Sequence, residues 1–219
     1  MIDVKSLNKS YGNFKALDQL NIHVDLGSVY GLLGPNGSGK TTLIKHLSGI
    51  YKNETGSITI NNKPVFDNPE CKAEIVYISD NPFFFSQYSI NETAEFYAGI
   101  YPSWSWERFN ALKQAFPIDI KRRTVKLSKG MQKQVAFWLG ISVRPKVMLF
   151  DEPLDGVMPL LFPCCYCVSS WISQAMSIMF PKLPMLKKHI LAAILTFGLK
   201  GIILILKIFI QMIQPSTEI

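Results

Sequence analysis

Short hydrophobic runs alternate with turn residues in the first third of the chain. Apolar residues recur in 21–24, 27–34 and 56–60, and glycine or asparagine bounds each of these runs. Runs of this kind predict β-strands. Residues 41–48 instead have the apolar spacing of a helix, and Gly49 is placed to end it. The chain therefore begins as an α/β fold in which a strand, a loop and a helix follow one another.

The pattern becomes helical in the middle of the chain. Helical spacing is found in residues 92–101, 106–116 and 129–139, and a proline comes directly after each of the first two segments. Residues 147–150 then form a short run that is apolar at every position. A run without alternation predicts a central parallel strand that is covered on both faces. We therefore expect a helical insertion between two parts of one α/β core.

Composition restricts the class of protein. The 219 residues are 48% hydrophobic and 18% charged, which excludes intrinsic disorder and allows one large domain or two small ones. The net charge is +7, but residues 164–219 carry five lysines against one glutamate, so more than half of the excess lies in the tail. The charge therefore does not indicate a nucleic-acid partner. The basic, apolar pattern of a secretory signal is absent from the first residues, so we expect a reducing cytosol around the body of the chain.

The cysteines do not predict a metal site. Cys71 stands alone, and Cys164, Cys165 and Cys167 have no second pair of cysteines or histidines after them. A structural zinc site needs four ligands, usually as two such pairs. We therefore expect neither zinc nor a disulfide framework.

A phosphate-binding loop is the strongest chemical signal. Residues 34–41 match G-x-x-x-x-G-K-[ST] at every fixed position, with a predicted strand before them and a predicted helix after them. In such a loop backbone N–H groups surround the phosphates, and the helix contributes its positive N-terminal end. Lys40 would reach the β and γ phosphates, and the Thr41 hydroxyl would ligate Mg²⁺. The alternative is a glycine-rich turn before an ordinary helix.

Two carboxylates follow the all-apolar run. Asp151 and Glu152 stand at the end of the strand predicted for residues 147–150. This arrangement fits a Walker B site, in which Asp151 holds Mg²⁺ and Glu152 orients or deprotonates the attacking water. Without the phosphate loop upstream, an acidic surface pair would explain these residues equally well. With it, the pattern predicts nucleotide hydrolysis.

A third motif lies between these two. Residues 127–134 read Leu-Ser-Lys-Gly-Met-Gln-Lys-Gln and resemble the L-S-G-G-Q signature of the ATP-binding subunits of ABC transporters, with Lys129 and Met131 as departures. Ser128 is a natural N-cap for the following helix, and Gly130 lies beside the N–H donors of its first turn. The alternative is a plain amphipathic helix with solvated lysines. Residues 80–88, 116–122 and 151–156 are similar to the YtrB-like group of this family.

The resemblance covers residues 1 to about 156 and implies a cytoplasmic subunit, peripheral on the inner face of a bacterial membrane. Such subunits bind ATP and Mg²⁺, dimerise with a second ATP-binding subunit and drive a separate membrane permease. The resemblance implies that Lys40 and Glu152 are catalytic and that Thr41, Asp80 and Asp151 serve the metal. Asp80 occupies the place where most members have glutamine, and Ser128 and Gly130 would act in trans. The resemblance also implies that twelve residues contact the nucleotide: Tyr11, Gly34, Pro35, Asn36, Gly37, Ser38, Gly39, Lys40, Thr41, Thr42, Ser128 and Gly130.

The implied fold is a P-loop NTPase core of the ABC type with a helical subdomain. We assign residues 1–83 and 145–163 to the nucleotide-binding core and residues 84–144 to the helical subdomain. Residues 164–219 form an apolar, basic tail. This tail departs from the family, so we expect a truncated or frame-shifted end; a membrane-embedded tail and a divergent folded end are the alternatives. A foreign end would leave the core sheet without its last strands and would favour poor solubility.

Two further interpretations of function remain open. Met158 stands where the family has the D-loop aspartate, and His189 lies beyond the expected position of the switch histidine. These departures favour a non-catalytic or non-functional fragment that at most binds nucleotide, whereas Glu152 favours turnover. A GTPase would need an N-K-x-D motif, and residues 62–65 end in valine where the aspartate is required. The cargo and the direction of transport cannot be inferred.

Overall fold

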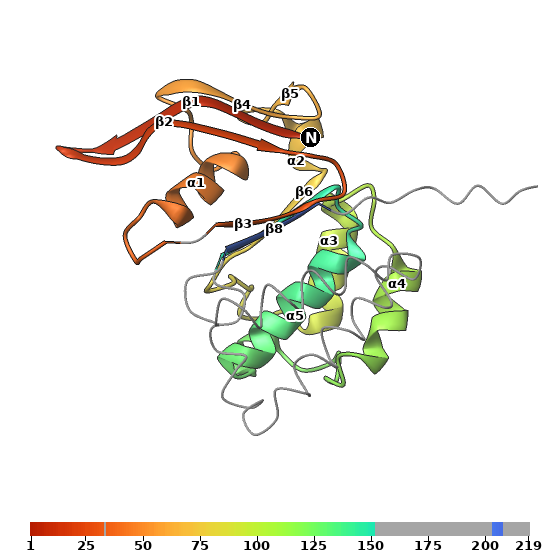
Figure 1. Cartoon of the computed structure of the whole chain (residues 1–219). Coiled ribbons are helices and arrows are strands. Elements are labelled where there is room, and N and C mark those ends of the chain that lie inside the picture. Colours follow the sequence, from red (N-terminus) through yellow and green to blue (C-terminus); the bar gives the residue numbers. More distant parts are fainter. Residues whose placement is uncertain (33, 152–202, 208–219) are drawn as a thin grey trace, which may run out of the picture.

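The computed structural model describes residues 1–32, 34–151 and 203–207, which form two four-stranded sheets with helices between and below them (Figure 1). The elements in chain order are β1 (Ile2–Tyr11), β2 (Phe14–Val24), β3 (Val29–Leu32), α1 (Lys40–Leu47), β4 (Thr55–Ile60), β5 (Lys63–Pro64), α2 (Pro69–Lys72), β6 (Ile75–Ile78), α3 (Ile90–Ile100), α4 (Trp106–Ala111), η1 (Leu112–Gln114), η2 (Thr124–Lys126), α5 (Lys129–Ser142), β7 (Val147–Phe150) and β8 (Ile203–Lys207).

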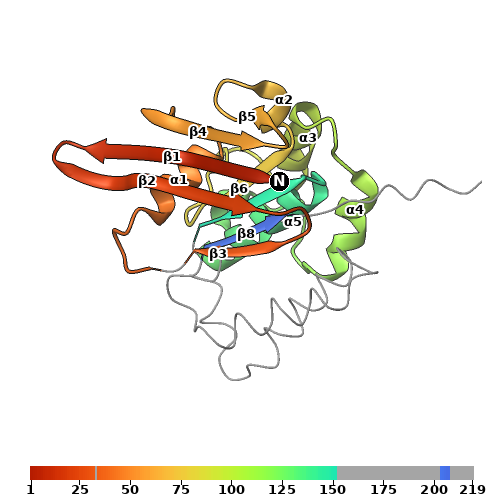
Figure 2. The ribbon, with the colours of Figure 1, turned by 45° about the horizontal axis from the view of Figure 1, so that its top comes forward.

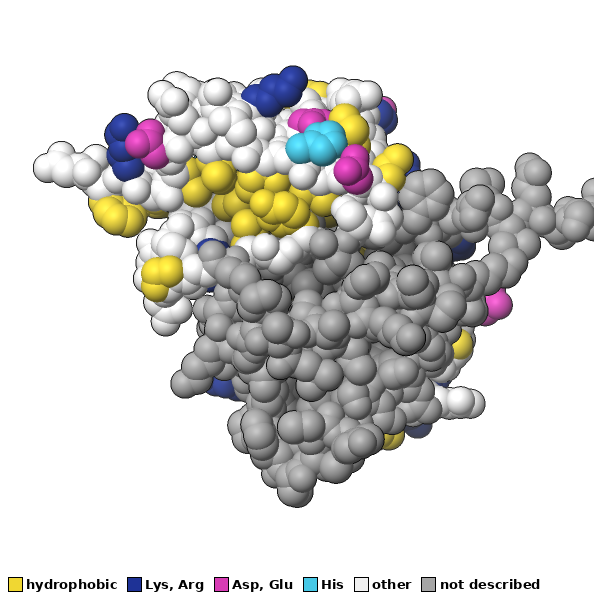
Figure 3. Space-filling view, viewed as in Figure 1, with side chains coloured by type: hydrophobic (Ala, Val, Ile, Leu, Met, Phe, Trp, Pro, Cys, Tyr) yellow, Lys and Arg dark blue, Asp and Glu magenta, His cyan; other side chains and the backbone are white. Residues whose placement is uncertain are grey.

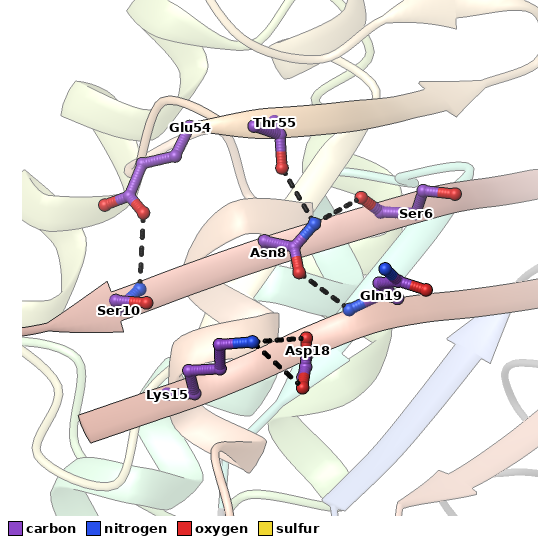
Figure 4. Close-up of polar contacts among 8 residues, drawn as sticks. All are labelled: Ser6, Asn8, Ser10, Lys15, Asp18, Gln19, Glu54 and Thr55. Atoms are coloured by element: carbon purple, nitrogen blue, oxygen red, sulfur yellow. Dashed lines mark hydrogen bonds and ion pairs between the residues drawn. The ribbon is translucent and has the colours of Figure 1, made fainter. Parts of the chain in front are cut away.

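The first sheet has the strand order β2-β1-β4-β5, and its described pairs are antiparallel. Its register shifts within β1 beside Asn8, whose side chain repairs the interrupted ladder (Figure 4). The Asn8 amide nitrogen donates to Ser6 O at 3.0 Å and to Thr55 Oγ1 at 2.8 Å, and its Oδ1 accepts from the Gln19 N–H at 2.8 Å. The bonds to Ser6 O and from the Gln19 N–H satisfy backbone groups beside the register shift, and the bond to Thr55 links the side chain to β4.

The second sheet has the order β3-β8-β7-β6. β6 and β7 pair in parallel, with Ile78 opposite Phe150. β8 lies between β3 and β7 and is antiparallel to both. We expected a sheet that lacks its last strands; among the described residues, 203–207 supply one strand, which joins β3 to β7. The remaining tail, including the three clustered cysteines, Met158 and His189, lies outside the described residues.

Each face of the second sheet covers a different hydrophobic core. Val76, Ile78, Met148 and Phe150 pack in one cluster with the helical region, in which Trp138 of α5 is fully buried. The alternate residues of the same strands face the other cluster, which includes Leu43, Ile44 and Leu47 of α1 and the first sheet. All four residues of β7 are buried, as the all-apolar run predicts. α1 therefore lies between the two sheets, and α5 lies on the opposite side of the second sheet (Figure 2).

The helices begin and end close to the positions predicted from the sequence. Ser89 and Glu92 form a reciprocal capping box at the start of α3, and Ser128 caps α5 by accepting a hydrogen bond from the Met131 N–H at 3.3 Å. The helix predicted for residues 106–116 is shorter than expected. It ends at Ala111 and continues as the 3₁₀ turn η1.

The described surface combines a polar upper edge with a band of hydrophobic side chains below strands β1 and β2 (Figure 3). On the polar edge His23 lies between Asp3 and Asp25, with its ring nitrogens 2.6 Å and 3.1 Å from their carboxylates.

In the part of the chain that the structure describes, no helix has both the length and the hydrophobicity that crossing a membrane would need.

Candidate nucleotide site

The phosphate loop joins β3 to α1, and two of its glycines adopt conformations that other residues avoid. Gly37 has φ 82° and Gly39 has φ 86°, both in the left-handed region. A Cβ atom on Gly39 would lie 2.3 Å from the carbonyl oxygen of Ala16. Glycine is therefore required at this position by both the backbone angle and the close approach of β2. The Ser38 N–H donates to Pro35 O at 3.2 Å and closes the turn.

A pocket of about 310 Å³ opens in front of the loop. Two exposed aromatic residues are part of its lining: Tyr11 ends β1, and Phe14 begins β2 directly opposite it. Seven of the residues predicted to contact nucleotide line the pocket. The described lining consists of Tyr11, Phe14, Ala16, Asn36, Gly37, Gly39, Lys40, Thr41 and Thr42.

Phe14 was not among the predicted residues. The sequence carries a usable signal for it, because Gly12 and Asn13 form a two-residue turn that sets Phe14 across from Tyr11. The pair presents two aromatic side chains on one side of a pocket whose other side is a phosphate-type loop. A flat, apolar ring such as a nucleobase suits this side of the pocket.

Lys40 holds the loop in its closed shape. Its ammonium group donates to the carbonyl oxygens of Gly34 at 2.7 Å and Pro35 at 2.8 Å. The side chain therefore crosses the loop from the first turn of α1 to the loop's beginning. Gly39 precedes α1 and provides no side-chain cap, and no acidic residue lies in the first turn of the helix. The positive end of α1 and the Lys40 charge thus act together on the loop.

Asp151 joins the phosphate loop to the end of β7. It is 5% exposed, and its Oδ1 accepts a hydrogen bond from the Thr41 hydroxyl at 3.1 Å. Its Oδ2 accepts a longer bond, 3.4 Å, from the hydroxyl of Tyr77 on β6. Burial raises the pKa of the Tyr77 phenol above its ordinary value, and the nearby Asp151 carboxylate raises it further. Tyr77 therefore stays a hydrogen-bond donor at neutral pH, a role that the sequence did not suggest.

Asp80 has a partner that was not predicted. Its Oδ1 lies 2.6 Å from the Nζ atom of Lys133, which is on α5. The Lys133 side chain is 5% exposed and that of Asp80 is 43% exposed. The predicted metal contact is thus engaged by a lysine from the helix that carries the signature residues.

The signature residues lie apart from the loop. Ser128 and Gly130 are at the start of α5, and the described lining of the loop pocket contains neither of them. This separation is compatible with the predicted action in trans. Glu152, the predicted water-activating base, lies outside the described residues, although Asp151 immediately before it is described.

The donor set around Thr41 suits a magnesium ion. Mg²⁺ prefers hard oxygen ligands and is held in nucleotide sites by one or two protein groups together with phosphates and water. The Thr41 hydroxyl and the Asp151 carboxylate supply such oxygens beside the loop. Among the described residues, no group of three His, Cys, Asp or Glu side chains forms an all-protein metal site. The Thr41 and Asp151 oxygens therefore suit a metal ion whose other ligands are phosphate oxygens and water.

These features define a phosphate-loop nucleotide-binding fold with an attached helical region. The ABC transporter family model matches residues 17–155. The chain belongs to the ABC transporter family, as the resemblance implied.

Relatives and solved structures agree with this assignment. The chain is 29% identical over 157 residues to the ABC transporter ATP-binding protein YtrB of Bacillus subtilis (strain 168), covering 72% of this chain and 54% of that protein. It is 34% identical over 162 residues to the spermidine/putrescine import ATP-binding protein PotA of Legionella pneumophila (strain Lens), covering 72% and 44%. The chain thus spans about half the length of these curated relatives.

The fold is also shared with solved cassettes. An ATP-binding subunit of an ABC transporter matches with a TM-score of 0.67 and 24% identity, over 81% of this chain and 74% of the other. A dimeric post-hydrolysis cassette bound to ADP and Pi matches with a TM-score of 0.64 and 19% identity, over 81% and 82%. The predicted fold class is confirmed.

Proposed function

We propose that the chain is the ATP-binding and ATP-hydrolysing subunit of an ABC transporter and powers a separate membrane permease. The observation that carries this proposal is the hydrogen bond that joins Thr41 of the phosphate loop to Asp151, beside a pocket that Tyr11 and Phe14 help to line. Family membership and the name of the relative YtrB support the same function.

In this proposal different residues of the pocket bind the base, the phosphates and the metal. Tyr11 and Phe14 stack against the base, the loop backbone and Lys40 hold the phosphates, and Thr41 with Asp151 orients the metal. When bound, Mg²⁺ supplies a Lewis acid for the phosphate oxygens. The Lys40 ammonium bonds to two carbonyls of the loop, so its charge lies at the proposed phosphate position. Glu152 takes the proton of the attacking water.

The proposed assembly is a dimer with two nucleotides at its interface. Ser128 and Gly130 lie outside the loop pocket of their own chain, so the second subunit is proposed to present these residues to the γ-phosphate. Ser128 caps the start of α5, and the positive N-terminal end of a helix suits a phosphate anion. The proposed location is the cytoplasmic face of a bacterial membrane, next to the permease.

Binding and turnover are tested on the full chain. We expect a fluorescent ATP analogue to bind with Mg²⁺ present, and Lys40→Ala to weaken binding by about tenfold or more, because a charge-assisted phosphate contact is lost. Glu152→Gln should keep binding and reduce phosphate release by about a hundredfold. Lys52→Ala, a change of an exposed lysine in a loop, is the matched control and should alter neither quantity. Absence of nucleotide binding in the native chain would contradict the proposal.

A second candidate is a nucleotide-binding chain without turnover. Met158 in place of the D-loop aspartate and the displaced His189 favour it. The two candidates are separated by a chimera in which residues after Gly156 are replaced by the corresponding end of YtrB. If the native chain and the chimera both release phosphate, the tail supports catalysis. If both bind the analogue but only the chimera turns it over, the second candidate is correct.

A further inference from the structure

Asp80 and Asp151 belong to the same edge of the second sheet. They follow β6 and β7, which are adjacent and parallel, with Ile78 opposite Phe150. The Asp151 N–H donates to Ile78 O at 3.0 Å, which extends the pairing one residue beyond the strands. Asp80 and Asp151 therefore follow neighbouring strands at the same edge of the sheet.

Lys133 brings a positive charge to this acidic edge from the other subdomain. The lysine is one turn into α5, and its side chain is nearly excluded from water. A buried ammonium group is stable only beside an opposite charge, because desolvation penalises it strongly. The 2.6 Å contact with Asp80 supplies that charge, across 53 residues of sequence.

Resting on the proposed function, we propose that Lys133 is a positioning residue that neutralises Asp80 until Mg²⁺ arrives with ATP. The metal and the Lys133 ammonium then compete for one carboxylate, so loading of the site loosens the contact that ties the start of α5 to the end of β6. Lys133 thereby adjusts how strongly ATP binding depends on Mg²⁺. Lys133 is not among the described residues that line the loop pocket.

The proposal predicts a change in one ratio. The readout is the dissociation constant of a fluorescent ATP analogue in EDTA divided by the constant in Mg²⁺. In Lys133→Met the Asp80 charge is left uncompensated and repels the polyphosphate, so binding in EDTA weakens while Mg²⁺ restores it. The ratio should increase by roughly tenfold, as expected for one close charge pair. In Asp80→Asn the ratio should decrease, and the double variant should resemble Asp80→Asn.

Control variants separate the proposed role from a general loss of structure. Lys133→Arg keeps the charge and should keep the native ratio, while Lys113→Met removes an exposed lysine of the same region and should leave the ratio unchanged. The nucleotide-free proteins are compared by urea unfolding, in which the Lys133→Met and Asp80→Asn shifts in midpoint should not add, because the residues are coupled. If Lys133→Met does not fold, the ratios measured for Asp80→Asn and Lys133→Arg still test the inference.

Each outcome has one meaning. Binding with a ratio that is the same in the native chain, Lys133→Met and Asp80→Asn overturns this inference and leaves the proposed function standing. If the native chain itself binds no analogue in either buffer, the proposed function fails, and this inference fails with it. A raised ratio in Lys133→Met together with a lowered one in Asp80→Asn supports both.

Discussion

Asp151 is the residue at which the phosphate loop, β6 and β7 meet, because its two carboxylate oxygens accept bonds from Thr41 and Tyr77. Tyr77→Phe removes one of these donors at nearly constant volume. We expect the free energy of unfolding to decrease by about 1 kcal/mol, the usual net value of one hydrogen bond, with no change of fold. Urea unfolding measures this decrease in the free energy of unfolding. Tyr51→Phe is the control, since the Tyr51 hydroxyl has no hydrogen bond among the described residues; equal effects of the two changes would contradict the assignment.

His23 makes the stability of the first sheet depend on pH. Its hydrogen bond to Asp3, followed by that to Asp25, raises the pKa of the exposed imidazole above 6.5. A raised pKa means that the folded state binds the proton more tightly, so the stabilisation is complete below the unfolded pKa and disappears as pH rises through the folded pKa. The urea midpoint of the native chain should therefore exceed that of His23→Gln most clearly near pH 6. The difference should shrink toward pH 9, and salt should reduce it.

At the scale of elements, α3 depends on its capping box. Ser89 Oγ accepts from the Glu92 N–H at 3.2 Å, and the Ser89 N–H donates to the Glu92 carboxylate at 2.7 Å. Ser89→Ala should destabilise the chain by about 1 kcal/mol, measured by urea unfolding at pH 7. The neighbouring exposed Ser86→Ala is the control and should have little effect.

The same box has a pH signature. Its hydrogen bonds, first from the Ser89 hydroxyl and then from its N–H, lower the pKa of Glu92. The contribution of the carboxylate is therefore present above the unfolded pKa and is lost as pH falls through the lowered folded value. Glu92→Gln should remove this acid dependence. A native chain with the same acid profile as Glu92→Gln would show that the carboxylate does not act in the cap.

The elements predicted from the sequence are those whose signals are local. The buried β7, the loop before α1 and the Ser128 cap each follow from adjacent residues, and the structure contains them. Contacts between distant segments could not be predicted in this way. The Asp80–Lys133 pair, for example, depends on how α5 packs against β6. The 3₁₀ end of α4 was missed because apolar spacing continues past Ala111.

At the scale of the whole molecule, the chain closes its second sheet with a segment from its far end. Tyr30 of β3 and Leu149 of β7 both lie opposite Ile205 of β8, so this strand has a neighbour on each side. Residues 203–207 are apolar, as is most of the tail around them. Hydrophobic periodicity therefore could not single out β8 in the sequence.

The contribution of β8 can be measured with a single substitution. Ile205→Pro removes an N–H from a central strand and introduces a ring that central strands do not accept, so unfolding free energy should decrease by about 3 kcal/mol. Ile205→Val retains the N–H and a β-branched side chain and is the matched control. Tryptophan fluorescence during urea unfolding reports both, because Trp138 is fully buried against the helical face of this sheet. If proline at this position leaves the midpoint unchanged, β8 contributes nothing to the fold and the sheet is held by β3, β6 and β7 through other contacts. If the midpoint falls as expected, residues 203–207 are an integral part of the nucleotide-binding core, and a foreign tail that merely follows an ABC half-site is excluded for this segment.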